Sequence, residues 1–443
     1  MNKVLIYILV LVSLISSCRK DDQSVFNQSP DDRLNATLAK YQAQLTGAQY
    51  GWKGIVYPDG GGAYSFYFKF NDSNRVKMYS DFDTVTAVTL KESSYRLKAL
   101  QQPSLIFDTY SYIHLLSDPN EYIGVVADVN GGPIGVGLQS DFEFYFDSTT
   151  VDTIKLVGRY NGSKAVLIRA TSQEATAYNN GQLAVGFLLN RFLTYFKRLT
   201  IGTQLIDVKI TPSAHTFTFT YLDAGGASRT FTTGYYLTAG GIVFINPLVI
   251  GNVTIIGFNN MQWIATTQTI SLTVNNVAST ITGIVVPIKV DVTAPKRWWD
   301  YAVSNSVPYW FSGNGFHVNG VDDAYKINSL TDGTSTFYYL IYWPRYGSNY
   351  DFVAPVFQNA AQTSLVPLTY GMAIRTPPTF TSDGRAVFVR LGDVPPYPAT
   401  GPAALTKVKF TEPGGYYFVQ TSAATYDMVN ATDGRSWISW ETF

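Results

Sequence analysis

Short segments in which aromatic or aliphatic residues alternate with polar ones constrain the fold of this chain most. Over residues 64–70 an aromatic residue occupies every second position, with Ser65 and Lys69 among the residues between them. Side chains on a strand point alternately to its two faces, so this pattern predicts a strand with one apolar face. Similar segments recur along the chain, separated by turn signals such as residues 71–74 and Asn161-Gly162. The sequence therefore predicts a mainly β protein.

The composition agrees with a β fold and argues against one class of partner. Aromatic residues make up 15% of the 443 residues and charged residues only 14%, a mixture typical of β proteins. The 32 basic residues equal the 32 acidic ones, and no basic stripe is visible, so we expect no nucleic-acid partner. The chain has a single cysteine, which excludes an intrachain disulfide.

The first predicted domain, residues 31–170, begins with a helix. Ser29 and Pro30 have the chemistry of a helix start, and apolar residues recur at helical spacing up to Leu45, before Gly47. About eight strands follow, with the clearest hairpin turning at Asn161-Gly162. This order predicts an antiparallel, calycin-like barrel or a strongly curved sheet. A two-sheet sandwich would give the same periodicity.

A second, related β domain is predicted over residues 171–290. Thr171 and Glu174 match a capping box, and an apolar stripe predicts a longer helix over about 182–199. Threonines alternate with aromatic residues over 216–221, which predicts a solvent face against an apolar face. Three segments occur in the same order in both domains, which we interpret as a weak internal duplication. They are 104–107, 141–144 and 152–156 in the first domain and 241–244, 260–263 and 268–272 in the second.

The last part of the chain, residues 291–443, is predicted to be an aromatic-rich β and irregular region. Its boundary lies at residues 286–295, and the tail from Gly415 predicts a final strand pair with a turn at Asp433-Gly434. Tyr and Trp rings stack on sugars and anchor interfaces, although such rings also fill cores. If Trp298 and Trp299 lie on a strand, they cannot both point inward. The candidate ligand-binding residues are Trp298, Trp299, Tyr309, Trp310, Tyr339, Trp343 and Tyr346.

The amino terminus predicts where the protein is located. After Lys3, residues 4–15 are almost entirely apolar and lead through small residues to Cys18. The apolar run is too short to cross a hydrocarbon core about 30 Å thick, so residues 1–17 are expected to be a cleaved signal peptide. The residues before Cys18 resemble a bacterial lipobox, which implies a lipid on the Cys18 thiol. Residues 18–30 would then form a lipidated tether.

Several stretches extend this resemblance to a family. Residues 19–22 resemble the signal that sends lipoproteins of Bacteroidota to the outer face of the outer membrane. Further stretches that carry a likeness to a known family are 50–54, 74–81, 108–110, 140–144 and 433–437. Through them the chain resembles a Bacteroidota outer-membrane lipoprotein family of unknown function, encoded beside SusC/SusD-like nutrient importers. The resemblance implies an outer-membrane lipid, an importer and a glycan or peptide ligand as partners. It supplies no catalytic residue.

No catalytic, metal or cofactor site is expected from the motifs. The histidines stand apart from one another and from the cysteine, so no zinc spacing is present. Two acid pairs are available for glycosidase chemistry, Asp81 with Asp83 and Asp322 with Asp323. We expect these acids to be turn residues or to lie on solvated faces. The isolated histidines are His114, His215 and His317.

These observations favour a surface-exposed outer-membrane lipoprotein without catalytic activity. We expect it to serve as a binding or accessory component of a TonB-dependent glycan or peptide uptake system. A glycan-acting hydrolase with an unrecognised carboxylate pair is one alternative. A structural or adhesive surface protein is another.

Overall fold

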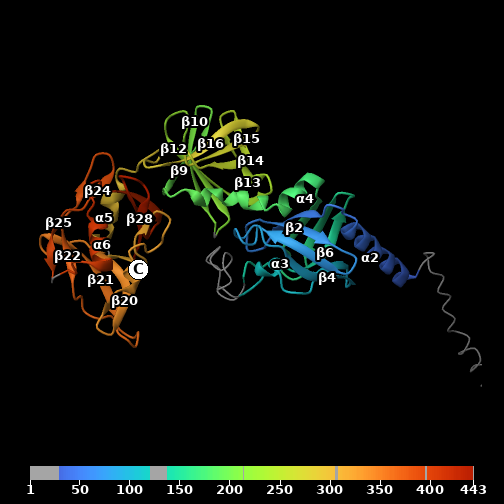
Figure 1. Cartoon of the computed structure of the whole chain (residues 1–443), viewed down its shortest axis with the longest axis horizontal. Coiled ribbons are helices and arrows are strands. Elements are labelled where there is room, and N and C mark those ends of the chain that lie inside the picture. Colours follow the sequence, from blue (N-terminus) through green and yellow to red (C-terminus); the bar gives the residue numbers. More distant parts are fainter. Residues whose placement is uncertain (1–28, 120–136, 213, 305–307, 395–396, 443) are drawn as a thin grey trace, which may run out of the picture.

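The computed structural model contains two closed barrels and one larger curled sheet (Figure 1). It describes residues 29–119, 137–212, 214–304, 308–394 and 397–442. Cys18, the signal peptide and a strand predicted over 122–128 lie outside these residues. The prediction of a mainly β protein is confirmed. Within the described part of the chain, no helix is long and apolar enough to cross a membrane.

The first barrel has eight antiparallel strands in chain order, and β1 pairs with β8 to close it. The barrel prediction is therefore confirmed over a sandwich. The preceding helix, α2, begins where its cap predicted: the Ser29 hydroxyl accepts the Asp32 amide at 3.1 Å. The elements are α2 (Pro30–Thr46), β1 (Trp52–Tyr57), β2 (Tyr64–Phe70), β3 (Arg75–Ser80), β4 (Lys91–Ala99), β5 (Pro103–Phe107), α3 (Tyr112–Leu115), β6 (Glu143–Thr149), β7 (Thr153–Gly158) and β8 (Lys164–Arg169).

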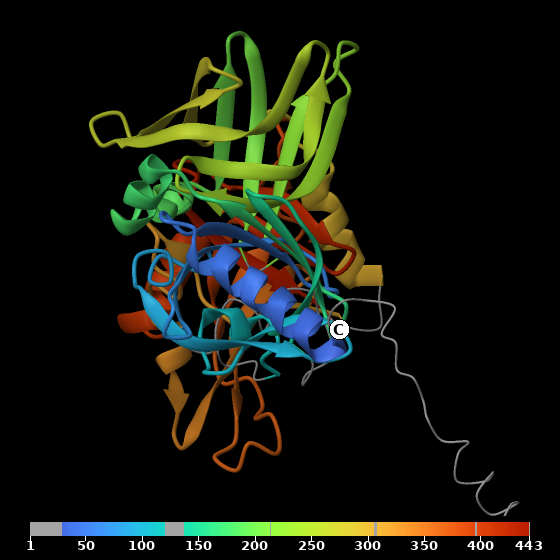
Figure 2. The ribbon, with the colours of Figure 1, turned by 90° about the vertical axis from the view of Figure 1, so that its right-hand side faces the viewer.

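Aromatic side chains fill this barrel. Phe66 and Phe68 of β2 are buried in its core, whereas Tyr67 between them packs into the core of the second barrel. Helix α2 lies against the barrel, as Figure 2 shows, and the Tyr41 ring of α2 stacks on Phe146 at 3.9 Å. Strand β2 is therefore buried on both faces because it lies between two cores.

The second barrel repeats this topology. A capping box joins Thr171 and Glu174 at the start of α4, as predicted. Eight antiparallel strands then follow in order, and β16 pairs with β9. The elements are α4 (Ser172–Asn179), η1 (Gln182–Arg191), β9 (Phe196–Ile201), β10 (Gln204–Thr211), β11 (Thr216–Leu222), β12 (Ser228–Thr238), β13 (Gly241–Ile250), β14 (Val253–Ile264), β15 (Thr269–Val274) and β16 (Val277–Ile284).

The helix predicted over 182–199 is wrong in type and in its end. A 3₁₀ helix, η1, ends at Arg191, and the chain is in strand β9 from Phe196 onward. Leu199 and Ile201 are buried in the barrel, whereas Arg198 before Leu199 pairs with Asp207 and Thr200 between Leu199 and Ile201 is only partly buried. This period of two is the signature of a strand, and the helical spacing of the earlier apolar residues hid the change.

The segments that predict a duplication lie on matching strands. Residues 104–107 lie on β5 and residues 241–244 on β13, the fifth strand of each barrel. The other two pairs lie at the sixth strands, β6 and β14, and the seventh strands, β7 and β15. The second β domain is thus related to the first in topology as well as in these segments.

The third unit is a curled twelve-stranded sheet that packs on α5 and α6. Its strand order is β23-β24-β26-β27-β28-β17-β20-β21-β22-β25, with β18 and β19 at the side. The elements are α5 (Ala294–Ser304), β17 (Trp310–Ser312), β18 (His317–Val318), η2 (Ile327–Ser329), β19 (Thr331–Asp332), β20 (Ser335–Trp343), β21 (Tyr350–Gln358), β22 (Gly371–Arg375), β23 (Thr379–Phe380), β24 (Arg385–Val387), β25 (Arg390–Val394), α6 (Gly401–Phe410), β26 (Tyr416–Ser422), β27 (Thr425–Asn430) and β28 (Ser436–Glu441).

The tail differs from the predicted strand pair by one strand. Three strands, β26, β27 and β28, follow Gly415. The predicted turn at Asp433-Gly434 joins the last two, and Gly434 has a φ of 62°, which favours glycine.

Buried polar contacts join the two barrels. The Asp81 carboxylate is fully buried and accepts the Ser65 amide of its own barrel and the Leu237 amide of the second, each at 2.9 Å. The His215 imidazole Nδ1 lies 3.0 Å from the Ala63 carbonyl oxygen across the same interface. Burial raises the pKa of Asp81, and nearby His215 opposes that rise. Asp81 therefore connects the barrels through two backbone donors.

Replacing Asp81 by asparagine is expected to lower the free energy of unfolding by about 1–3 kcal/mol. An amide keeps one acceptor oxygen but turns an N–H donor toward one of the two backbone amides. Chemical unfolding of the full chain measures the loss. Asp72→Asn, an exposed acid of the same barrel, is the control and should change stability by less than about 0.5 kcal/mol. Equal stability of the two variants would contradict the bridging role.

Candidate functional site

Three of the predicted aromatic residues lie in the core of the third unit. Trp298 and Trp310 are fully buried, and Trp299 is 4% exposed. Trp298 and Trp299 are adjacent on helix α5, not on a strand. The argument that one of them must point outward therefore fails, because the curled sheet surrounds α5 closely enough to cover both. These rings have almost no surface for a ligand.

Trp299 belongs to a buried hydrogen-bond network. Its indole Nε1 donates to Asp351 Oδ2 at 2.9 Å, and the Tyr342 hydroxyl donates to the same oxygen at 2.5 Å. The Arg345 amide donates to Asp351 Oδ1 at 2.7 Å, and its guanidinium lies 4.6 Å from the centre of the Trp299 ring. Asp351 is fully buried, so the network holds α5, β20 and β21 together.

The other four predicted residues gather on the opposite face of the sheet. The Tyr309 and Tyr339 hydroxyls lie 3.2 Å apart, and the Trp343 ring centre is 5.4 Å from that of Tyr309 and 5.0 Å from that of Tyr346. Tyr309 and Trp310 point to different faces because they are consecutive at β17. Tyr339 is 5% exposed and Tyr346 42%. Tyr309 and Trp343 are half-buried, so the cluster could offer a ligand parts of these two rings and the exposed Tyr346.

The candidate acid pairs are occupied by their own loops. Asp83 accepts the Thr86 amide at 2.7 Å, and the Asp323 oxygens accept the amides of Ile327 and Asn328. Asp322 contacts His317 Nδ1 at 2.6 Å while its side chain is 92% exposed. Among the described residues, no three His, Cys, Asp or Glu side chains are grouped to hold a metal ion.

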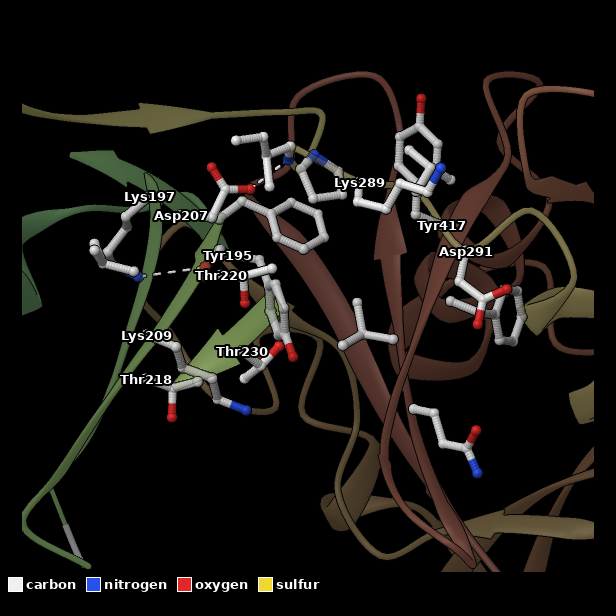
Figure 3. A pocket seen from close by; sticks show the side chains of 18 of the residues that line it. Tyr195, Lys197, Asp207, Lys209, Thr218, Thr220, Thr230, Lys289, Asp291 and Tyr417 are labelled. Atoms are coloured by element: carbon white, nitrogen blue, oxygen red, sulfur yellow. Dashed lines mark hydrogen bonds between the residues drawn. The ribbon is translucent and has the colours of Figure 1, made fainter. Parts of the chain in front are cut away.

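A groove of about 550 Å³ lies between the second barrel and the third unit (Figure 3). We call it the barrel–sheet groove. The barrel supplies one wall from Tyr195 and strands β9 to β12, and β26 supplies the opposite wall. The connecting segment, residues 287–291, forms a further side together with Arg297 of α5. The sequence predicted a domain boundary here but no site.

Threonine hydroxyls line the barrel wall of the groove. Thr218 and Thr220 of β11 line the groove, while Phe217 and Phe219 are fully buried in the barrel. Thr230 of β12 is the antiparallel partner of Thr220 and extends the row. The alternation of threonines and aromatic residues over 216–221 predicted this outward face. It is the sequence pattern that could have indicated the barrel wall of the groove.

Lysines give the groove an excess of positive charge. The acids of the groove are already paired: Asp207 with Arg198 at 2.7 Å, and Asp291 with Arg297 at 2.8 Å. Hydrogen bonds from Arg297 lower the pKa of Asp291 to about 2. The three lysines, in contrast, have no carboxylate of the described chain within salt-bridge distance. They are Lys197, Lys209 and Lys289.

Lys197 is the most enclosed of these cations. Its Nζ donates to the carbonyl oxygens of Thr194 and Tyr195 at 3.2 and 3.4 Å, which leaves one of its three donors. Burial lowers the pKa of Lys197 to about 8, and repulsion by Lys209 adds to that decrease. A nearby anion would relieve both effects.

Aromatic rings form the end of the groove near the third unit. The half-buried Trp437 ring stacks on His317 with centres 3.7 Å apart and meets the edge of Tyr195 at 5.3 Å. The Tyr195 hydroxyl donates to Asp427 at 2.5 Å, and its amide donates to the Gly434 carbonyl at 2.7 Å. These contacts join the barrel to the sheet beside the groove. Sequence reasoning selected none of the groove residues.

A family model described as "Domain of unknown function (DUF4302)" matches residues 22–264, more than half of the chain. The chain belongs to the DUF4302 family. The expected likeness to a family of unknown function is thereby confirmed, and the family description names no activity. The DUF4302 match covers the first barrel and the second barrel up to the end of β14. It includes the barrel wall of the groove but not the connecting segment or β26.

Comparisons with other proteins add no functional information. No curated protein matches the sequence. Transferrin binding protein B of Neisseria meningitidis serogroup B is 9% identical, with 88% of this chain and 74% of that chain covered and a TM-score of 0.13. The H. pylori beta clamp is 8% identical, with 93% and 98% covered and a TM-score of 0.14. Such low TM-scores support no inference about this DUF4302 member.

Proposed function

We propose that the protein is a non-catalytic binding protein that holds its ligand in the barrel–sheet groove. The observation that carries this proposal is the convergence, in one groove, of unpaired lysines, a row of threonine hydroxyls and aromatic rings. Polar groups and aromatic rings that converge in one pocket are typical of ligand-binding sites. The hydrolase alternative has less support, because backbone amides already occupy the carboxylates of Asp81, Asp83 and Asp323.

The proposal includes a location and a partner. A lipid on Cys18 would hold the mature protein on the outer face of the outer membrane, where it would serve a SusC/SusD-like, TonB-dependent importer. The sequence around Cys18 supports this placement. Protease added to intact cells should then degrade the protein, and Cys18→Ser should release it from the membrane fraction. Protection from protease in intact cells would contradict surface exposure.

A large side chain that fills the groove should weaken ligand binding strongly. Thr220→Trp places a large ring in the groove from a half-buried position whose neighbours in the barrel core are unchanged. The mature full-length protein and this variant are tested on glycan and peptide arrays, and we expect the wild-type signal to fall by roughly tenfold or more in the variant. Thr280→Trp is the control, because Thr280 is exposed on β16 of the same barrel and outside the groove. Equal binding by the two variants would place the site elsewhere.

A further inference from the structure

The charges of the groove indicate the sign of its ligand. Asp207 and Asp291 are each neutralised by an arginine at less than 3 Å. Lys197, Lys209 and Lys289 line the same groove and have no acid partner in the described chain. A ligand in this groove would therefore meet Lys209 and Lys289, which no acid neutralises, and the remaining donor of Lys197, whose Nζ also contacts two carbonyl oxygens. Charged groups placed in this way attract and orient an anion.

The side chains that line the groove favour a sugar as its ligand. A peptide commonly binds a β protein by adding a strand to an unpaired edge. The barrel is closed, so the barrel wall has no free strand edge. In the opposite wall, β26 pairs with β27 along its length and with β24 only at Tyr416 and Tyr417. The threonine hydroxyls and the half-buried ring of Trp437 match the hydroxyl groups and apolar faces of sugar rings.

We infer that the barrel–sheet groove binds an acidic oligosaccharide, with its carboxylate or sulfate groups against Lys197, Lys209 and Lys289. This inference rests on the proposed binding function and narrows its ligand class. The threonine hydroxyls would accept hydrogen bonds from the sugar hydroxyls and donate hydrogen bonds to them. Lys209 and Lys289 are exposed at the groove, so they can meet the ligand before Lys197, which lies deeper.

The first test asks whether binding depends on the charge of the oligosaccharide, at a fixed length of its sugar chain. The mature full-length protein is titrated with three sets of oligosaccharides of equal length: uronate-containing, sulfated and neutral. We expect binding of at least one acidic set and affinity at least roughly tenfold weaker for the neutral set, because charge-assisted hydrogen bonds are the stronger ones. The affinity should fall with added salt. The two acidic sets distinguish a carboxylate from a sulfate as the recognised group.

Matched lysine variants assign the effect to the groove. Lys209→Gln combined with Lys289→Gln should weaken acidic-glycan binding by roughly tenfold or more. Lys98→Gln combined with Lys164→Gln removes the same charge from exposed positions of the first barrel and should change it less than about twofold. Lys209→Arg should retain most of the affinity.

The outcomes separate this inference from the proposed function. Equal affinity for neutral and acidic glycans, or binding of acidic peptides alone, would overturn the acidic-glycan inference while leaving a binding function in place. Equal losses in the two double variants would also overturn it. A folded protein that binds no glycan and no peptide would overturn the proposed function itself.

Discussion

Replacing Asp351 by alanine is expected to lower the free energy of unfolding of the third unit by about 4 kcal/mol or more. The carboxylate is fully buried and accepts hydrogen bonds from Trp299, Tyr342 and the Arg345 amide. Alanine leaves these three donors without a partner in the core, and each buried unsatisfied donor costs about 1–3 kcal/mol. Burial and the neighbouring Asp351 charge also raise the pKa of Tyr342 well above its usual value, so Tyr342 stays a donor.

Denaturant unfolding followed by tryptophan fluorescence measures this loss. Six of the eight tryptophans lie in residues 291–443, so the signal reports mainly on the third unit. Asp300→Ala is the control, because Asp300 forms a partly exposed ion pair with Lys296 on the same helix, and such pairs contribute less than about 1 kcal/mol. A midpoint for Asp351→Ala equal to that of Asp300→Ala would show that the network does not hold the unit together.

Affinity for an acidic glycan is expected to fall several-fold as the pH rises from 7 to 9. Lys197, with a pKa of about 8, loses its charge in this interval. The groups that face the groove with it are Lys209 and Asp207 of β10, Lys289 and Asp291 of the connecting segment, Arg297 of α5, and Tyr195 and Tyr417. Burial raises the pKa values of both tyrosines, so they stay neutral over this range. Asp291, whose pKa is lowered to about 2, remains ionised and paired with Arg297.

The free energy of unfolding, unlike the affinity, should rise with pH, and it should do so between about pH 8 and 10.5. The pKa of Lys197 is lower in the folded protein than its ordinary value of 10.5. The folded state therefore binds fewer protons than the unfolded state between about pH 8 and 10.5, and the free energy of unfolding rises with pH there. Below pH 8 both states hold the proton and the cost of burying the charge is fully present.

Calorimetric titration at pH 7 and 9 checks the binding half of this prediction. Lys197→Arg keeps its charge at both values and should remove most of the pH dependence. The neutral oligosaccharide serves as a second control, since its affinity should not change with the Lys197 charge. Wild-type affinity for the acidic ligand that is the same at pH 7 and 9 would exclude Lys197 from the site.

The sequence predicts the fold best where one local pattern has one structural solution. The alternation in β2 and the Ser29-Pro30 start of α2 gave elements with the observed bounds. Apolar spacing was ambiguous between 182 and 199. The apolar residues up to Phe192 fit a helical stripe, and Phe196 and Leu199 continue that spacing although they lie on strand β9. The neighbours Trp298 and Trp299 were equally ambiguous, since a helix enclosed by a sheet buries both and a single strand does not.

The groove could not be predicted because its walls are distant in sequence. Lys197 and Tyr417 lie more than two hundred residues apart, and only the packing of the second barrel against the curled sheet brings them to one groove. In isolation, each lysine resembles an ordinary solvated residue. The threonine row was visible as an outward face, but nothing in its alternation indicated that another unit lies opposite.

The segment that connects the second barrel to α5 has a mechanical consequence. Residues 287–291 are both the covalent link between two units and a side of the groove, and the Ile288 amide donates to Asp207 of the barrel. A ligand bound there would contact the second barrel, the connecting segment and the curled sheet at the same time. It would therefore link the two units without a covalent bond. Occupancy would restrict movement of the curled sheet relative to the second barrel.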